Sequence, residues 1–150
     1  MSEDIALIRD RALRLLSRRE HSVSELVRKL NKGDGCSEDV LAVVEQLRDE
    51  GLQSDDRFTE AYIHSRVQRG YGPVRIRQEL RERSISDELL ASHLEINDPR
   101  WNEEVRHVRE KKYGKVLPST YQDKIKQSQF LQYRGFTSEQ IRRIFRTDET

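Results

Sequence analysis

The segment RGYGPVRIRQEL, Arg69–Leu80, places two glycines and a proline directly before a run with helical spacing. With Gly72 as the N-cap, Pro73 takes the first helical position, where its missing N–H costs nothing and its fixed φ suits the helix. Tyr71 and Ile76 have the spacing of a hydrophobic staple, which packs across a helix start. A glycine-rich turn before a helix can also cradle phosphate. Because no strand precedes this turn and no Lys-Ser or Lys-Thr follows it, we interpret it as a structural helix start.

Helical spacing extends through almost the whole chain. Near the N-terminus, Ile5, Ile8 and Ala12 recur every three or four residues, and Val40 and Val44 do the same further on. Such spacing places apolar side chains on one face of a helix. No stretch alternates between apolar and polar residues as a half-buried strand would. The sequence therefore predicts an all-α protein.

The helix starts also reveal an internal repeat. ISDELL (85–90) aligns with FTSEQI (136–141) at an offset of about 51, and SELVRKL (24–30) aligns with VRIRQEL (74–80) at about 50. A period near 50 that contains three helices predicts a tandem array of three three-helix units, an elongated and curved solenoid. Because so small a triplet cannot bury a core alone, we expect neighbouring units to stack. We place the units at residues 1–53, 54–97 and 98–150.

Several other helix starts carry capping residues. A Ser or Thr followed three residues later by Glu or Gln forms a capping box, in which two side chains satisfy free backbone N–H groups. The pairs with this spacing are Ser22 with Glu25, Ser119 with Gln122, and Thr137 with Gln140. A further N-cap is predicted at Asp55 or Asp56, ahead of the helix that begins RFTEAY.

The composition suits an elongated helical protein with an uneven charge distribution. Apolar residues make up 34% and charged residues 37% of the chain, and the net charge is +1. Residues 1–57 carry 10 basic and 13 acidic side chains, whereas residues 98–150 carry 12 and 8. The C-terminal part is thus expected to face a polyanion or an acidic partner. Arginines outnumber lysines 21 to 7, which favours bidentate contacts with phosphate or carboxylate.

Signals for export, membrane insertion and catalysis are missing from the sequence. Cys36 is the single cysteine, which excludes an internal disulfide and indicates a reducing compartment, and it has the spacing of a staple residue. No apolar run is long enough to span a membrane, and the acidic start does not resemble a signal peptide. The four histidines lack ligand spacing, and no serine has a base nearby. We predict a cytoplasmic, monomeric non-enzyme without metal or cofactor.

Basic side chains gather near the helix start described above and in the last unit. Arg77 and Arg81 stand one helical turn apart and are expected to face solvent together. If the units stack in register, these residues and those of the last unit could line one groove, although solvated helix faces would have the same composition. The candidate partner- or DNA-binding residues are Arg66, Arg69, Arg75, Arg77, Arg81, Lys111, Lys112, Lys115, Arg134, Arg142, Arg143 and Arg146.

Four segments together resemble the RecX family of bacterial proteins that regulate RecA recombinase. They are SRREHSVSEL (17–26), SDDRF (54–58), GYGPVRIRQEL (70–80) and FLQYRGFTSEQIRRIF (130–145). The resemblance covers essentially the whole chain and implies three tandem three-helix repeats. It further implies binding inside the groove of the RecA–single-stranded DNA filament, with inhibition of strand exchange, ATP turnover and RecA-stimulated repressor cleavage in the SOS response. No cofactor is implied.

Two other functions fit the residues. Three-helix units with basic helices resemble helix-turn-helix modules, and PVRIRQ (73–78) places arginines at the start of one such helix. Tight, sequence-selective binding to bare duplex DNA would favour that function. A scaffold repeat protein for an unrelated partner would show neither DNA affinity nor an effect on RecA.

Overall fold

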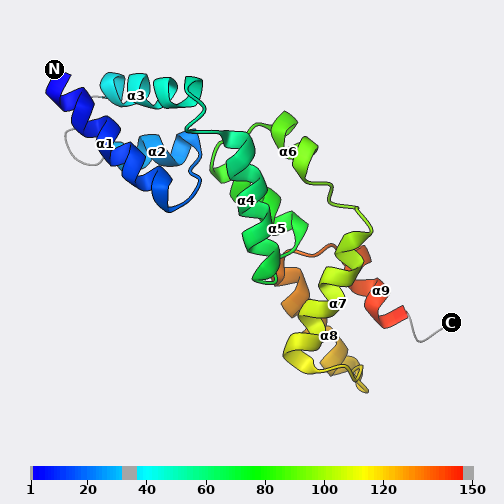
Figure 1. The fold of residues 1–150 in the computed structure, drawn as a ribbon. Helices are drawn as coiled ribbons and strands as arrows, with labels where there is room; N and C mark the ends of the chain where they lie inside the picture. The colour runs from blue at the N-terminus through cyan, green and yellow to red at the C-terminus, as the bar shows by residue number, and fades with distance from the viewer. Residues whose placement is uncertain (1, 32–36, 147–150) are drawn as a thin grey trace.

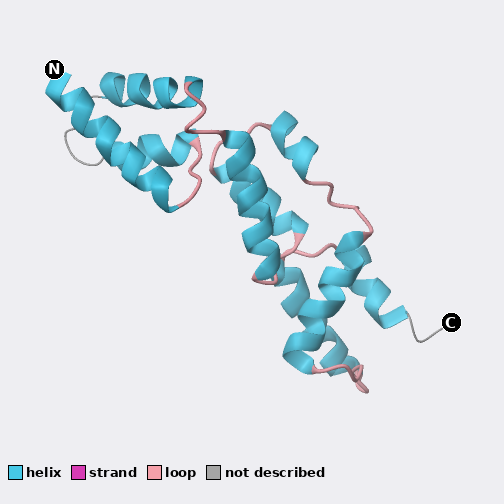
Figure 2. Ribbon diagram, in the orientation of Figure 1, coloured by secondary structure: helices cyan, strands magenta, loops and turns pink. Residues whose placement is uncertain are grey.

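The structure is a computed structural model that describes residues 2–31 and 37–146, and within these ranges it contains nine helices and no strands. Figure 2 shows the helices joined by irregular segments. The all-α prediction is confirmed, while Cys36 and its predicted staple lie outside the described residues. The helices are α1 (Ser2–Arg18), α2 (Val23–Leu30), α3 (Ser37–Asp49), α4 (Asp55–Gln68), α5 (Pro73–Glu82), α6 (Asp87–His93), α7 (Arg100–Tyr113), α8 (Tyr121–Arg134) and α9 (Ser138–Arg146).

Consecutive helix triplets pack into units that follow one another along an elongated molecule (Figure 1). Helices α1, α2 and α3 contact one another, as do α4, α5 and α6, and also α7, α8 and α9. The first and last helices lie at opposite ends of the array (Figure 1). The predicted tandem array of three-helix units is therefore confirmed.

Most of the expected helix starts are observed. Ser22 begins α2 with a complete capping box, and the Thr137 hydroxyl accepts a hydrogen bond in the first turn of α9. Two predictions were wrong by one or two residues. The α8 N-cap is Thr120 rather than Ser119, and the α4 N-cap is Ser54 rather than either of the aspartates that follow it. An N-cap side chain bonds the backbone N–H three residues later, so neighbouring polar residues meet this requirement equally well and the spacing alone does not choose between them.

In the described part of the chain, the buried apolar residues form two separate clusters. One belongs to the first unit alone and includes Ala12, Leu26 and Leu47. The other is shared by the second and third units, where Ile76 of α5 and Leu131 of α8 belong to the same cluster. The expectation that every triplet needs a neighbour to bury its core is wrong for the first unit and holds for the other two. The molecule thus consists of a one-unit body followed by a two-unit body.

Two glycines lie where the backbones of the second and third units meet. The N–H of Gly72 donates to the carbonyl of Arg134 (2.8 Å), and the N–H of Val74 donates to the carbonyl of Gly135 (2.9 Å). A Cβ atom on Gly72 would lie 2.6 Å from the carbonyl carbon of Gly135, so only glycine permits this approach. The turn before α5 is a helix start as predicted, and the third unit occupies the position a phosphate would need.

Polar side chains form the joint between the first and second units. The Asp55 carboxylate accepts hydrogen bonds from the backbone N–H of Val23 (2.9 Å) and from Gln53 Nε2 (2.9 Å). The buried Gln53 amide also donates to the carbonyl of His21 (3.1 Å). These bonds, together with the ion pairs of Glu25 described next, are called the polar joint below.

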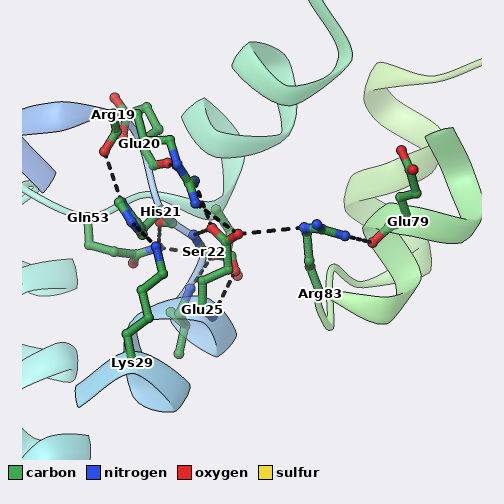
Figure 3. A network of polar contacts seen from close by, with 11 residues as sticks. Arg19, Glu20, His21, Ser22, Glu25, Lys29, Gln53, Glu79 and Arg83 are labelled. Carbon is green, nitrogen blue, oxygen red and sulfur yellow. Dashed lines mark hydrogen bonds and ion pairs between the residues drawn. The ribbon is translucent and has the colours of Figure 1, made fainter. Parts of the chain in front are cut away.

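Glu25 is buried at the centre of the polar joint (Figure 3). Its carboxylate accepts hydrogen bonds from Arg19 Nη1 (3.0 Å) and Nη2 (3.2 Å), and Arg83 Nε lies 3.6 Å away. Arg83 also donates to the carbonyl of Glu79 (2.9 Å), so it links α2 to α5 (Figure 3). Burial alone would raise the pKa of Glu25, but the hydrogen bonds and charge of Arg19, the backbone N–H of Ser22 and the charge of His21 together outweigh it, and the pKa lies below its ordinary value.

This carboxylate makes the joint acid-sensitive. A group with a lower pKa in the folded than in the unfolded state binds fewer protons when folded, so it stabilises the fold above the unfolded pKa. Glu25 makes this contribution in full above pH 4.5, the ordinary pKa of a glutamate. The contribution is lost as the pH falls from there through the lower pKa of Glu25 in the folded protein. We expect Glu25→Gln to be less stable than the parent near neutral pH and to lose less stability on acidification. Urea unfolding across this pH range tests the expectation, with the exposed Glu45→Gln as the control. If the free energy of unfolding fell equally with pH for Glu25→Gln and the parent, the expectation would be contradicted.

Candidate functional site

Arginines from three elements surround the ring of Tyr71, between α4 and α5. The guanidinium carbons of Arg66, Arg75 and Arg134 lie 3.8, 4.5 and 5.1 Å from its centroid. Such placements are attractive because the ring face carries negative charge density. Arg134 Nη1 also donates to the carbonyl of Arg69 (2.9 Å). Tyr71 thus unites four of the predicted site residues in one group, called the Tyr71 cluster below.

Glu79 neutralises part of the Tyr71 cluster. Arg66 forms a bidentate pair with it, through Nε (2.9 Å) and Nη2 (2.8 Å), and Arg75 Nε lies 3.4 Å away. Burial alone would raise the pKa of Glu79, but hydrogen bonds from Arg66 and from the Tyr62 hydroxyl lower it overall. Arg66 and Arg75 therefore brace α4 and α5, and Arg69 keeps an exposed side chain without an ion pair to any described residue.

The third unit extends the cluster through Phe130. Its ring lies 5.0 Å from the guanidinium carbon of Arg134 and 4.4 Å from Lys112 Nζ. The neighbouring Lys111 and Lys115 are exposed, and their side chains pair with no carboxylate in the described part of the chain. Basic side chains therefore continue from α4 and α5 onto the end of α7.

A groove between α5 and α6 holds the other two candidates on α5. Arg77 and Arg81 line this groove of about 370 Å³ together with Asp87. Arg81 Nε lies 3.3 Å from the Asp87 carboxylate, in an exposed pair, and such pairs contribute little stability. Arg77 is half-buried and has no ion-pair partner among the described residues. Of these two arginines, Arg77 is the freer to bind a partner.

The last three candidates gather on α9 around one carboxylate. Arg142, Arg143 and Arg146 lie 3.0, 3.9 and 3.5 Å from Glu139, and all four side chains are exposed. Three cations share one anion, which leaves this face of α9 positive. No contact among the described residues joins this group to the Tyr71 cluster. The arrangement of all the candidate basic residues along one groove therefore stays a prediction.

Sequence reasoning missed Arg109, which is 1% exposed. Its guanidinium donates to Gln127 Oε1 (3.1 Å) and to three carbonyls of the loop that follows α7. It thereby holds the backbone that carries Lys115. Its position could have indicated that it is buried, because Arg109 follows Trp101 and Val105 at four-residue intervals on one face of α7, and both are buried.

Within residues 2–31 and 37–146, no cluster of three or more histidine, cysteine or carboxylate side chains is arranged to bind a metal. None of the helices described there is long and apolar enough to cross a bilayer. The histidine–carboxylate contact between His93 and Asp56 (2.7 Å) joins α6 to α4. It is part of the helix packing in the second unit.

Family models for the RecX three-helix domains match all three units. The first domain matches residues 9–47, the second residues 54–94 and the third residues 102–145. The chain belongs to the RecX family. The predicted resemblance is confirmed, and the matched ranges correspond to the helix triplets of the structure.

RecX proteins of other bacteria are similar over most of their length. The regulatory protein RecX of Halorhodospira halophila is 45% identical over 135 residues, which cover 90% of this chain and 84% of that relative. The regulatory protein RecX of Cronobacter sakazakii is 38% identical over 150 residues, covering 93% and 91%. Both relatives are named as regulators.

Crystal structures of RecX proteins share the fold. The RecX of Lactobacillus salivarius superimposes with a TM-score of 0.79 at 24% identity over 97% of both chains. A second regulatory protein RecX gives a TM-score of 0.80 at 26% identity, over 95% of this chain and 73% of that chain. The arrangement of three consecutive helix triplets is thus the RecX fold.

Proposed function

We propose that this chain binds the RecA–single-stranded DNA filament inside its helical groove and inhibits strand exchange, ATP turnover and RecA-stimulated repressor cleavage, without catalysing a reaction itself. The observation that carries the proposal is RecX membership across all three units of an elongated array. Basic groups on α4, α5, α7 and α9 lie along this array. Together they provide contacts for phosphate and for acidic protein surface.

The elongated shape supports a mechanism of inhibition. A body that contacts adjacent RecA protomers at once opposes any change in their spacing, and it fills the groove that incoming duplex must enter. The chain can make all its contacts at once only when RecA protomers are arranged as in the filament. Its affinity for the filament is therefore higher than its affinity for free RecA. A ligand shifts an equilibrium only by its differential affinity for the two states, so we propose that the chain binds an inactive filament geometry more tightly than the active one.

The proposal is tested by titrating the full chain into an ATPase assay of RecA on single-stranded DNA from the same organism. Loss of turnover at far fewer chains than RecA protomers would indicate capping or propagated stalling. Loss near one chain per few protomers would indicate coating of the groove. Unchanged turnover at saturating protein would overturn the proposal.

Arg77→Glu is expected to raise the concentration for half-maximal inhibition about tenfold, because one lost charged contact costs on the order of 1.4 kcal/mol. The salt dependence of binding should also become shallower by about one phosphate contact. Arg48→Glu on α3 serves as the control, because Arg48 is a solvent-exposed arginine in the acidic first unit. Equal inhibition and equal salt dependence for Arg77→Glu and the parent would exclude Arg77 as a contact.

The alternative function, a helix-turn-helix protein that reads duplex DNA, is supported by the three-helix units with arginines early in α5. Recognition helices present their N-terminal residues to the bases. In this structure the backbone of Gly135 covers the first turn of α5, and Arg75 is held by Glu79. This geometry favours the filament proposal, and tight sequence-selective binding to duplex without RecA would favour the alternative.

A further inference from the structure

Tyr133, near the end of α8, is 73% exposed. The guanidinium carbon of Arg75 lies 5.2 Å from its ring centroid, and Arg75 Nη1 approaches the Tyr133 carbonyl (3.4 Å). Arg75 therefore lies against one face of the ring and links it to α5. Because so much of the residue is exposed, the opposite face is open to solvent.

The ring lines a groove of about 500 Å³ between α5 and the end of α8, within the roughly 300–1,000 Å³ typical of ligand-binding pockets. Its lining includes two arginines, Arg75 and Arg77, and two glutamates, Glu79 and Glu82, so the formal charges cancel. Arg75 pairs with Glu79, and the part of the groove beside Tyr133 therefore suits an uncharged ring better than a phosphate.

Two side-chain amides border the same groove. Gln132 precedes the tyrosine, and Gln78 comes from α5. Amide side chains can both donate and accept hydrogen bonds, as the edges of nucleobases do. The Gln78 amide makes only a long contact with Glu82 (3.5 Å), so it can turn toward a ligand at little cost.

We propose that Tyr133 is a stacking platform for one base of a single-stranded nucleic acid, with Arg75 behind the ring and the amides of Gln78 and Gln132 at its edge. The inference rests on the proposed function, because it names a subsite for the DNA of the filament. Stacking on an exposed aromatic ring tolerates any base, because every base has a π face. The platform would hold a nucleotide without selecting sequence.

The test measures binding of the full chain to a fluorescently labelled oligothymidylate. Tyr133→Ala should weaken binding roughly 5- to 150-fold, which corresponds to the 1–3 kcal/mol typical of one stacked base. Tyr133→Phe keeps the ring and should bind as the parent does. Tyr121→Ala, at the other end of α8, removes a tyrosine of similar exposure (76%) and should have no effect.

Two further readouts separate stacking from a charge effect. The salt dependence should be the same for Tyr133→Ala and the parent, because no phosphate contact is removed. On an oligonucleotide with abasic sites in place of the bases, the parent should lose its advantage over Tyr133→Ala.

Equal affinities of the parent and Tyr133→Ala for the oligothymidylate would overturn the inference, as would an absence of binding by the parent. A loss seen only with RecA present would also overturn it and would assign Tyr133 to a protein contact. None of these results bears on whether the parent inhibits RecA turnover, so the proposed function fails or survives separately.

Discussion

Gly135→Ala is expected to lower the free energy of unfolding by roughly 2–5 kcal/mol. Gly135 has a φ of +105° and is buried, and a Cβ there would lie 2.4 Å from the Cβ of Arg75. The left-handed conformation costs a non-glycine residue roughly 1–2 kcal/mol, and forcing an atom into a packed contact typically costs another 1–3 kcal/mol. Because the contact joins the second and third units, the change should also separate α5 from α8. Guanidinium unfolding measures the loss.

Gly51→Ala provides the control. Gly51 also has a positive φ, +78°, but a Cβ there would meet nothing within 4 Å. Its replacement should cost only the conformational term, roughly 1–2 kcal/mol. The difference between the two variants therefore isolates the packing between units. Equal losses would show that the two turns relax apart without cost.

Arg109→Met is expected to cost roughly 1–3 kcal/mol, the range for leaving a buried hydrogen-bonding group without its partner. Methionine occupies a similar volume and adapts to irregular gaps, so a cavity contributes little. The loss comes from the Gln127 side chain and the three loop carbonyls, which are left without their donor. Trypsin should also cleave after Lys115 faster, because the loop loses its tether.

Arg106→Met is the matched control for that change. Arg106 lies on the same helix, one turn earlier, and is exposed. Surface substitutions of this kind usually change stability by no more than about 0.5 kcal/mol. A loss for Arg109→Met as small as that for Arg106→Met would mean that water satisfies the loop carbonyls in its place.

Signals between near neighbours in the sequence predicted much of the fold. The Gly72–Pro73 helix start and the capping box of Ser22 depend on residues within one helical turn, where backbone geometry links spacing to structure. The allocation of cores could not be predicted, because the apolar faces of all three units have similar spacing. Whether a unit closes on itself or shares its core depends on how helices cross, which spacing does not encode.

The sequence predicted which region of the candidate site is basic, but not the role of each basic residue. Arg66 and Arg69 are three residues apart and similar in sequence context, yet Arg66 pairs with Glu79 while Arg69 stays exposed. That difference arises where α4 packs on α5, thirteen residues later in the chain. Net charge identifies a basic region. It does not separate the arginines that brace the fold from those free to bind.

The two separate apolar clusters also have an evolutionary consequence. Among the described residues, the buried apolar side chains of the first unit form a cluster that includes none from the other two units, and changes at sites without shared partners usually have additive effects. The interior of the first unit can therefore diverge without compensating changes in the other two. Selection on how the bodies fit together falls instead on the few charged and amide side chains of the polar joint.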